Sequence, residues 1–142
     1  MKSNDHELEH SSDIVAAPGP EQEALKTINS YISAFNRRDL RGMNAAFHFP
    51  HVRIASGSIH VLEEDRFNED DFFTTFIDRT GWDYSLWDYR HAVQSKEDKV
   101  HFAVQFTRYT SDGAVIGHYP SLWIVALIDG RWGVQARSSF AP

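Results

Sequence analysis

Most of the side chains best suited to chemistry lie in the C-terminal half of the chain. His91 can act as a general acid or base, because an imidazole ordinarily titrates near pH 7. Tyrosine adds a directional hydroxyl on an apolar ring, and the candidates are Tyr31, Tyr89 and Tyr119. These residue types predict proton transfer to, or hydrogen bonding with, a small and mostly apolar molecule. Burial in an ordinary core is the more common explanation for residues of these types.

One metal-binding pattern occurs near the N-terminus. Residues 6–10 read His-Glu-Leu-Glu-His, a spacing that can place two imidazoles on one helix face to bind zinc. The segment has no apolar stripe and no evident third ligand, so we expect neither a metal site nor a metalloprotease. We also find no glycine-rich phosphate loop and no dinucleotide fingerprint, and we therefore expect no cofactor.

Composition limits the classes of function. The 142 residues carry a formal net charge of -6, which argues against a broad nucleic-acid surface. The chain has no cysteine, which excludes disulfides, thiolate metal centres and cysteine nucleophiles. No apolar run approaches the ~20 residues of a membrane span, and residues 1–5 lack the apolar stretch of a signal peptide. We expect a cytoplasmic protein with no nucleic-acid or membrane partner.

Elements that could position the chemistry follow from the spacing of apolar residues. Residues 1–18 are polar and predict a disordered tail, and residues 19–142 predict one domain. Apolar residues three and four apart indicate helices, and Asp39 is a good N-cap for the second of them. The predicted helices span about residues 21–38, 39–47 and 68–80, and two short strands are expected at 51–55 and 59–63.

The last 60 or so residues read as an antiparallel meander. Asp-Gly at 112–113 and at 129–130 is the strongest short hairpin signal, and Glu97-Asp98 marks a further turn. The predicted strands span residues 82–95, 99–110, 115–128 and 131–141. Together with the helices they predict an α+β fold, in which a curved antiparallel sheet of about six strands wraps on three N-terminal helices.

Tight turns fix the register, and the register gives one aromatic face. It pairs His91 with Val104, Val93 with Phe102, Phe102 with Trp123, Ser121 with Ser138, and Val125 with Val134. The predicted inner face therefore carries Tyr89, His91, Phe102, Tyr119, Ser121, Trp123 and Ser138. His118 and Arg137 fall on the outer face. A single β-bulge would bring them inside, where Arg137 could hold a carboxylate.

Two segments carry a resemblance to a known superfamily. The first is the helix–Asp–helix opening at residues 31–40, and the second is Ser-Leu-Trp-Ile-Val at 121–125 followed by Asp-Gly-Arg-Trp-Gly-Val-Gln at 129–135. In this order they resemble the nuclear transport factor 2 (NTF2)-like superfamily, in its SnoaL-like (polyketide-cyclase-like) branch. The resemblance implies a cone-shaped α+β fold with an internal pocket, and a homodimer packed through the outer sheet face.

The resemblance implies less about activity, because this fold supports isomerases, cyclases, dehydratases, hydrolases and non-catalytic adaptors. Tyr31 matches a tyrosine of the ketosteroid isomerase branch, but Ala55 stands where that branch has its aspartate base. Trp123 and Ile124 lie near the place of its second acid. A ketosteroid-type isomerase is therefore disfavoured. Superfamily dehydratases use histidines inside the cone, and His91 could take that role.

These observations lead to one predicted site and three hypotheses. We predict His91 and Tyr31 as catalytic residues and Arg137 and His118 as second-line candidates. The predicted substrate-binding residues are Tyr89, Phe102, Tyr119, Ser121, Trp123 and Ser138. The protein could be an isomerase, cyclase or dehydratase acting on a small apolar or aromatic molecule, a non-catalytic binder of such a molecule, or a protein-interaction adaptor.

Overall fold

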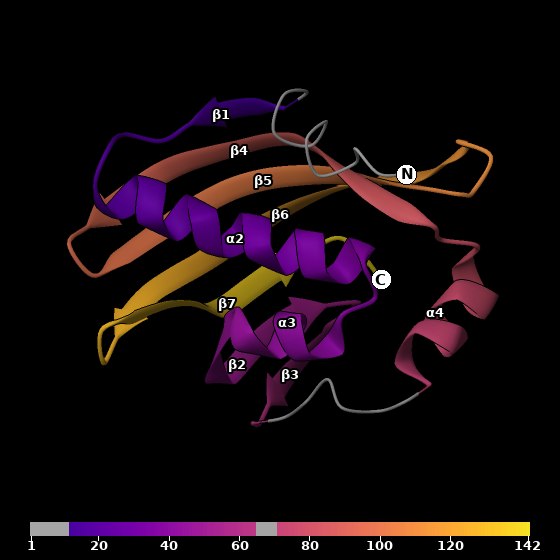
Figure 1. Ribbon diagram of the computed structural model, residues 1–142, viewed down its shortest axis with the longest axis horizontal. Coiled ribbons are helices and arrows are strands. Elements are labelled where there is room, and N and C mark those ends of the chain that lie inside the picture. The colour runs from indigo at the N-terminus through magenta and orange to yellow at the C-terminus, as the bar shows by residue number, and fades with distance from the viewer. Residues whose placement is uncertain (1–11, 65–70) are drawn as a thin grey trace.

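The computed structural model describes residues 12–64 and 71–142 and has an α+β fold (Figure 1). Its helices are α2 (Pro20–Asn36), α3 (Leu40–Ala45) and α4 (Phe72–Thr80). Its strands are β1 (Asp13–Val15), β2 (Phe47–Ala55), β3 (Ser58–Leu62), β4 (Tyr84–Lys96), β5 (Lys99–Tyr109), β6 (Val115–Ile128) and β7 (Arg131–Ser139). The predicted α+β class, the three helices and the four-strand ending are confirmed.

All the strands join one curved sheet in the order β1-β4-β5-β6-β7-β2-β3. The sheet has seven strands in the described residues rather than the predicted six. It is also mixed rather than purely antiparallel, because β1 pairs with β4 and β2 pairs with β7 in parallel. The additional strand is Asp13–Val15, which lies in the segment predicted to be a disordered tail. Three residues without a turn signal give no recognisable strand pattern.

The helix α2 lies across the inner face of β4–β7 (Figure 1). Its apolar stripe is buried as predicted, with Ile28 and Ile32 at 0% and 4% exposure. The stripe packs on the buried sheet residues Phe102, Val104 and Trp123 in one continuous core. Burial of this stripe, rather than helix propensity alone, therefore holds α2 on the sheet. None of the helices in the described ranges is long and apolar enough to cross a membrane.

The second helix is shorter than predicted. The Asp39 side chain accepts a hydrogen bond from the Gly42 amide at 3.0 Å, which confirms the predicted cap. The helix ends at Ala45, however, and β2 begins at Phe47 and continues through Pro50. The β2–β7 register is irregular between Phe47 and Val52, so the missing proline N–H interrupts no regular ladder there.

Three β-bulges decide which side chains face the helices. The β5–β6 register follows the prediction, with Phe102 opposite Trp123. The β4–β5 register shifts twice, between Trp87 and Tyr89 and again between Ala92 and Gln94. The β6–β7 register shifts between Ile124 and Val125, although Val125 still pairs with Val134. Because strand residues alternate between faces, each extra residue exchanges the faces of those beyond it.

Candidate functional site

A cavity lies between α2, α4 and the inner face of the sheet. Its inner part has a volume of about 30 Å³ and includes Ile32, Ser85, Phe106, Trp123, Ser139 and Ala141 in its wall. Its outer part has a volume of about 290 Å³ and is bordered by His60, Leu62, Phe72, Phe76, Arg79 and Pro142. Both parts share Tyr31, Phe35, Arg53, Arg108 and Arg137, so the two adjoin. The outer part has room for a compact organic molecule.

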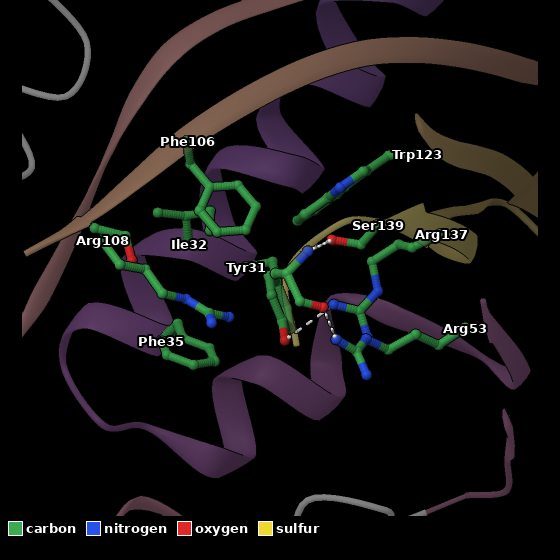
Figure 2. A pocket seen from close by; sticks show the side chains of 11 residues that line it. Tyr31, Ile32, Phe35, Arg53, Phe106, Arg108, Trp123, Arg137 and Ser139 are labelled. Atoms are coloured by element: carbon green, nitrogen blue, oxygen red, sulfur yellow. Dashed lines mark hydrogen bonds between the residues drawn. The ribbon is translucent and has the colours of Figure 1, made fainter. Parts of the chain in front are cut away.

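Aromatic rings form one wall of this cavity and fix Tyr31. Tyr31 is 3% exposed, stacks on Phe47 at 5.0 Å between ring centroids, and meets the edge of Trp123 at 5.5 Å. Phe35 packs on Phe76 at 5.7 Å in the same wall. Packing of this kind holds the Tyr31 ring in place, with its hydroxyl on the side where the guanidinium groups lie (Figure 2).

Three arginines converge on the cavity from different strands (Figure 2). Arg53 and Arg137 are directly paired across the parallel β2–β7 ladder, which brings both to the inner face. Arg108 lies two residues beyond Phe106 on β5 and therefore on the same inner face. The Arg53 Nη2 donates to the carbonyl of Ala141 at 3.0 Å.

A buried histidine orients Arg137. His51 Nδ1 donates to the Val134 carbonyl at 3.0 Å, so its Nε2 accepts the Arg137 Nε–H at 2.9 Å. The His51 ring also stacks on Phe47 at 3.9 Å. Burial, and then the charge of Arg137, lower the pKa of His51 to about 3. The imidazole is therefore neutral at pH 7 and uses both nitrogens to hold its neighbours.

The guanidinium groups rest on aromatic faces rather than on carboxylates. Arg137 lies 4.9 Å from the Phe47 ring centroid and 5.3 Å from that of Tyr31, and its Nη1 donates to the Tyr31 hydroxyl at 3.5 Å. Arg108 lies 4.9 Å from Phe76 and 5.0 Å from Tyr119. Burial lowers the pKa of Arg108 to about 10, so the side chain stays charged at pH 7.

The cavity wall is cationic although the protein as a whole is acidic. Neither part of the cavity has an aspartate or glutamate side chain among its described lining residues. Within residues 12–64 and 71–142, no ion pair joins Arg53, Arg108 or Arg137 to an acid. The site therefore concentrates positive charge in a chain whose net charge is -6.

The sequence places the chain in a known family. The family model "NTF2-like protein (DUF6841)" matches residues 22–139. The chain belongs to this NTF2-like family. No curated protein matches it.

Solved structures share the fold at low sequence identity. A protein of unknown function with a cystatin-like fold from Nostoc punctiforme is 13% identical, with a TM-score of 0.71 over 89% of this chain and 93% of that one. A ketosteroid isomerase-like protein from Erwinia carotovora is 19% identical, with a TM-score of 0.63 over 84% and 93%. An NTF2-like protein of unknown function from Shewanella oneidensis is 12% identical, with a TM-score of 0.64 over 85% and 98%. These likenesses confirm the cone fold.

Several predicted site residues of this NTF2-like protein do lie on the inner face. Tyr31, Trp123 and Arg137 line the cavity, and Arg137 reaches it through the bulge that the sequence left open. Ser121 is buried and donates to Ser139 at 2.8 Å, not to Ser138. The remaining two inner residues, Phe102 and Tyr119, pack in the core and against Phe106, outside the cavity wall.

The predicted inward position of His91 is wrong, so the predicted catalytic role of His91 has no place in this cavity. The bulge after Trp87 turns His91 to the outer face, where its Nε2 bonds the Asp13 carboxylate of β1 at 2.8 Å. Tyr89 is also outside and stacks on His91 at 4.9 Å. The fully buried Arg90 takes the inward position opposite Val104.

Two further candidates lie on the outer face. Ser138 is exposed opposite Leu122, because the β7 bulge exchanges the faces beyond it. His118 lies on the outer face, as the predicted β5–β6 register places it. Its Nδ1 forms a hydrogen bond with the Thr107 hydroxyl at 2.7 Å. Within the described residues no group of histidines and acids could hold a metal ion. The His-Glu-Leu-Glu-His motif at residues 6–10 lies outside the described residues.

Sequence reasoning missed Arg53, Arg108, His51 and Ser139. Arg108 carried a usable signal, because it continues the alternation Phe102, Val104, Phe106 on one face. His51 and Arg53 lie two residues apart in the predicted strand 51–55 and therefore share a face. The sequence assigns that strand no partner, so it does not show whether this face points inward or outward. Ser139 could not be found without the bulge.

The neutral state of His51 makes stability depend on pH. The unfolded chain takes up a proton near the ordinary pKa of 6.5, whereas the folded chain does so only near 3. Because the unfolded state binds more protons, stability falls as pH drops through this window. Between pH 7 and pH 5, His51→Gln should lose about 2 kcal/mol less unfolding free energy than the wild type.

Urea unfolding at the two pH values measures this difference. Glutamine keeps an oxygen that can accept the Arg137 Nε–H, and it cannot titrate. His118→Gln removes an outer-face imidazole and is the matched control. Equal losses of stability in the wild type and in His51→Gln would contradict the assignment.

Proposed function

We propose that this protein binds a small organic molecule in the cone cavity. The observation that carries the proposal is a cavity wall that combines aromatic rings with converging hydrogen-bond donors, the composition typical of ligand sites. An adaptor of the same fold is expected to fill its cone with side chains. The open volume of about 290 Å³ beside Tyr31 and Phe35 favours a ligand instead.

The wall supports binding better than base catalysis. Its described residues include no aspartate or glutamate side chain, and Ala55 is buried two residues beyond Arg53 on the same face, where a base could otherwise stand. His51 is neutral and occupied at both nitrogens. The one imidazole in the described wall, His60, lies exposed on the edge strand β3. Among the described wall residues, general-base chemistry therefore has no positioned, water-excluded base.

A second candidate is proton-transfer catalysis assisted by Tyr31. The Tyr31 hydroxyl lies beside Arg137 at the cavity wall, where it could donate to a substrate oxygen and stabilise developing negative charge. One structural neighbour is named a ketosteroid isomerase-like protein. Turnover of a bound ligand that is lost in Tyr31→Phe would favour this candidate, and binding without product favours the first.

Blocking the cavity mouth tests the proposed function. Leu62 borders the outer cavity from β3, so Leu62→Trp should fill the mouth and lower ligand affinity by about tenfold or more. Isothermal titration calorimetry with a panel of small aromatic molecules measures the affinity. Ile59→Trp is the matched control, because Ile59 lies on the opposite face of the same strand and is 71% exposed. Equal binding by both variants would contradict a ligand site in this cavity.

We also propose the homodimer that the sequence predicts through the outer sheet face. A row of outer residues crosses the sheet from Ile54 through Ser138 and Leu122 to Ala103. Ile54 is 46% and Leu122 is 50% exposed, which is a large apolar exposure for the middle of a sheet. A second copy of the chain would cover this row.

Charge placed in that row should separate the copies. We expect the wild type to have twice the monomer mass in light scattering after size exclusion, and Leu122→Arg to have the monomer mass. A buried, unpaired charge at the interface would cost more than the contact gains. Val115→Arg is the control, because Val115 is 53% exposed at the far end of β6. A monomeric wild type would refute the dimer.

A further inference from the structure

We propose that the ligand carries a carboxylate, received by Arg53, Arg108 and Arg137, on an aromatic or apolar body that packs against the rings of the cavity. The inference rests on the proposed function and names its ligand class. It follows from the charges, the donors and the walls of the same cavity (Figure 2).

The positive charge of the cavity wall favours an anionic ligand. Arg108 is 8% and Arg137 is 9% exposed, and no acid within residues 12–64 and 71–142 forms an ion pair with them. Buried charges in proteins are ordinarily paired, because an unpaired one loses its hydration without compensation. Arg53 and Arg137 are near enough that the charge of Arg137, after burial, lowers the pKa of Arg53. A bound anion would supply the missing charge.

Hydrogen-bond donors without acceptors at the cavity wall also favour an anionic ligand. A guanidinium has five N–H donors, and Arg53 donates one of them to the carbonyl of Ala141. The buried Nε of Arg108 has no hydrogen-bond partner, and neither has the buried indole nitrogen of Trp123. Arg53, Arg108 and Trp123 all line the inner part of the cavity, and Arg108 Nε and the Trp123 indole nitrogen have no acceptor. A carboxylate offers two oxygens and about four acceptor sites.

Arg131 shows how this chain satisfies a structural arginine. Its Nη1 donates to the Ala45 carbonyl at 3.0 Å, and its Nη2 donates to the Phe47 carbonyl at 3.0 Å and to His48 Nδ1 at 3.1 Å. Arg137 instead uses Nε on His51, which orients the side chain and leaves its outer nitrogens toward the cavity and the Tyr31 hydroxyl. Such preorganisation favours ligand binding, because less side-chain freedom is lost on association.

The walls decide between an organic acid and a free inorganic anion. Phe35, Phe72 and Phe76 border the outer cavity, whose volume is about 290 Å³. A hydrated sulfate or phosphate would gain nothing from these rings. An aromatic acid would bury its ring against them while its carboxylate meets the arginines.

The experiment compares matched acids and amides. Isothermal titration calorimetry at pH 7 uses benzoate and 2-naphthoate against benzamide and 2-naphthamide, with sulfate and inorganic phosphate at equal ionic strength. Each acid should bind about tenfold or more tighter than its amide, because only the carboxylate brings a negative charge that pairs with the guanidinium cations. Sulfate and phosphate should bind more weakly than the acids.

Arginine variants test whether the preference for acids over amides comes from the arginine cluster. Arg108→Gln and Arg137→Gln should each weaken acid binding by about tenfold or more, and should weaken amide binding less than acid binding. Arg41→Gln is the control, because Arg41 is exposed on α3 outside the cavity wall. If Arg137→Gln fails to fold, Arg108→Gln and the acid–amide comparison in the wild type still decide the question.

Each outcome separates the two proposals. Amides that bind as tightly as acids overturn the inference and leave the proposed function intact. Sulfate or phosphate binding as tightly as 2-naphthoate overturns the organic body. If no acid and no amide binds, the proposed function is rejected together with the inference.

Discussion

One extra residue in β7 determines what the cavity can do. Strand side chains alternate between faces, so the β6–β7 register shift between Val125 and Ile124 reverses every β7 side chain that follows it. Arg137 turns inward opposite Trp123, and Ser138 turns outward. The parallel β2 ladder then sets Arg53 beside Arg137 on the inner face. Without the bulge the same sequence would place a small hydroxyl in the cone and its guanidinium in solvent.

A buried guanidinium must be held as well as placed. Aromatic faces replace part of the hydration that the buried guanidinium loses, because the ring quadrupole attracts a cation. The ring centroids of Phe47, Tyr31 and Trp123 all lie within 5.7 Å of the Arg137 guanidinium. His51 supplies an oriented acceptor, which works only while the imidazole is neutral. Burial guarantees that state by lowering the pKa of His51 to about 3. The apolar core and the cationic site are thus one arrangement, since the rings that stabilise the fold also stabilise the charge.

Local patterns predicted the helices, the hairpins and the β5–β6 register, because each depends on neighbours in the sequence. Asp39 capped its helix and Phe102 met Trp123 as expected. The site was only partly predictable, because bulges have no reliable sequence signature and reverse faces over whole strands. One such bulge turns His91 to the outer face, and another turns Arg137 to the inner face. Arg108 needed no bulge, and strict alternation beyond Phe106 would have found it.

The fold by itself does not fix the chemistry of the cavity. A few residues on the inner face decide whether the cavity wall is positively or negatively charged. An acid at the position of Ala55 would lie two residues from Arg53 on the inner face and would neutralise the arginine cluster as an internal ion pair. With alanine there, the positive charge remains available to a ligand. Within the described wall, three arginines therefore stand without an aspartate or glutamate side chain beside them. Among the residues that the structure describes, alanine at position 55 and guanidinium groups without an ion-pair partner thus have the same consequence, a net positive charge at the cavity wall.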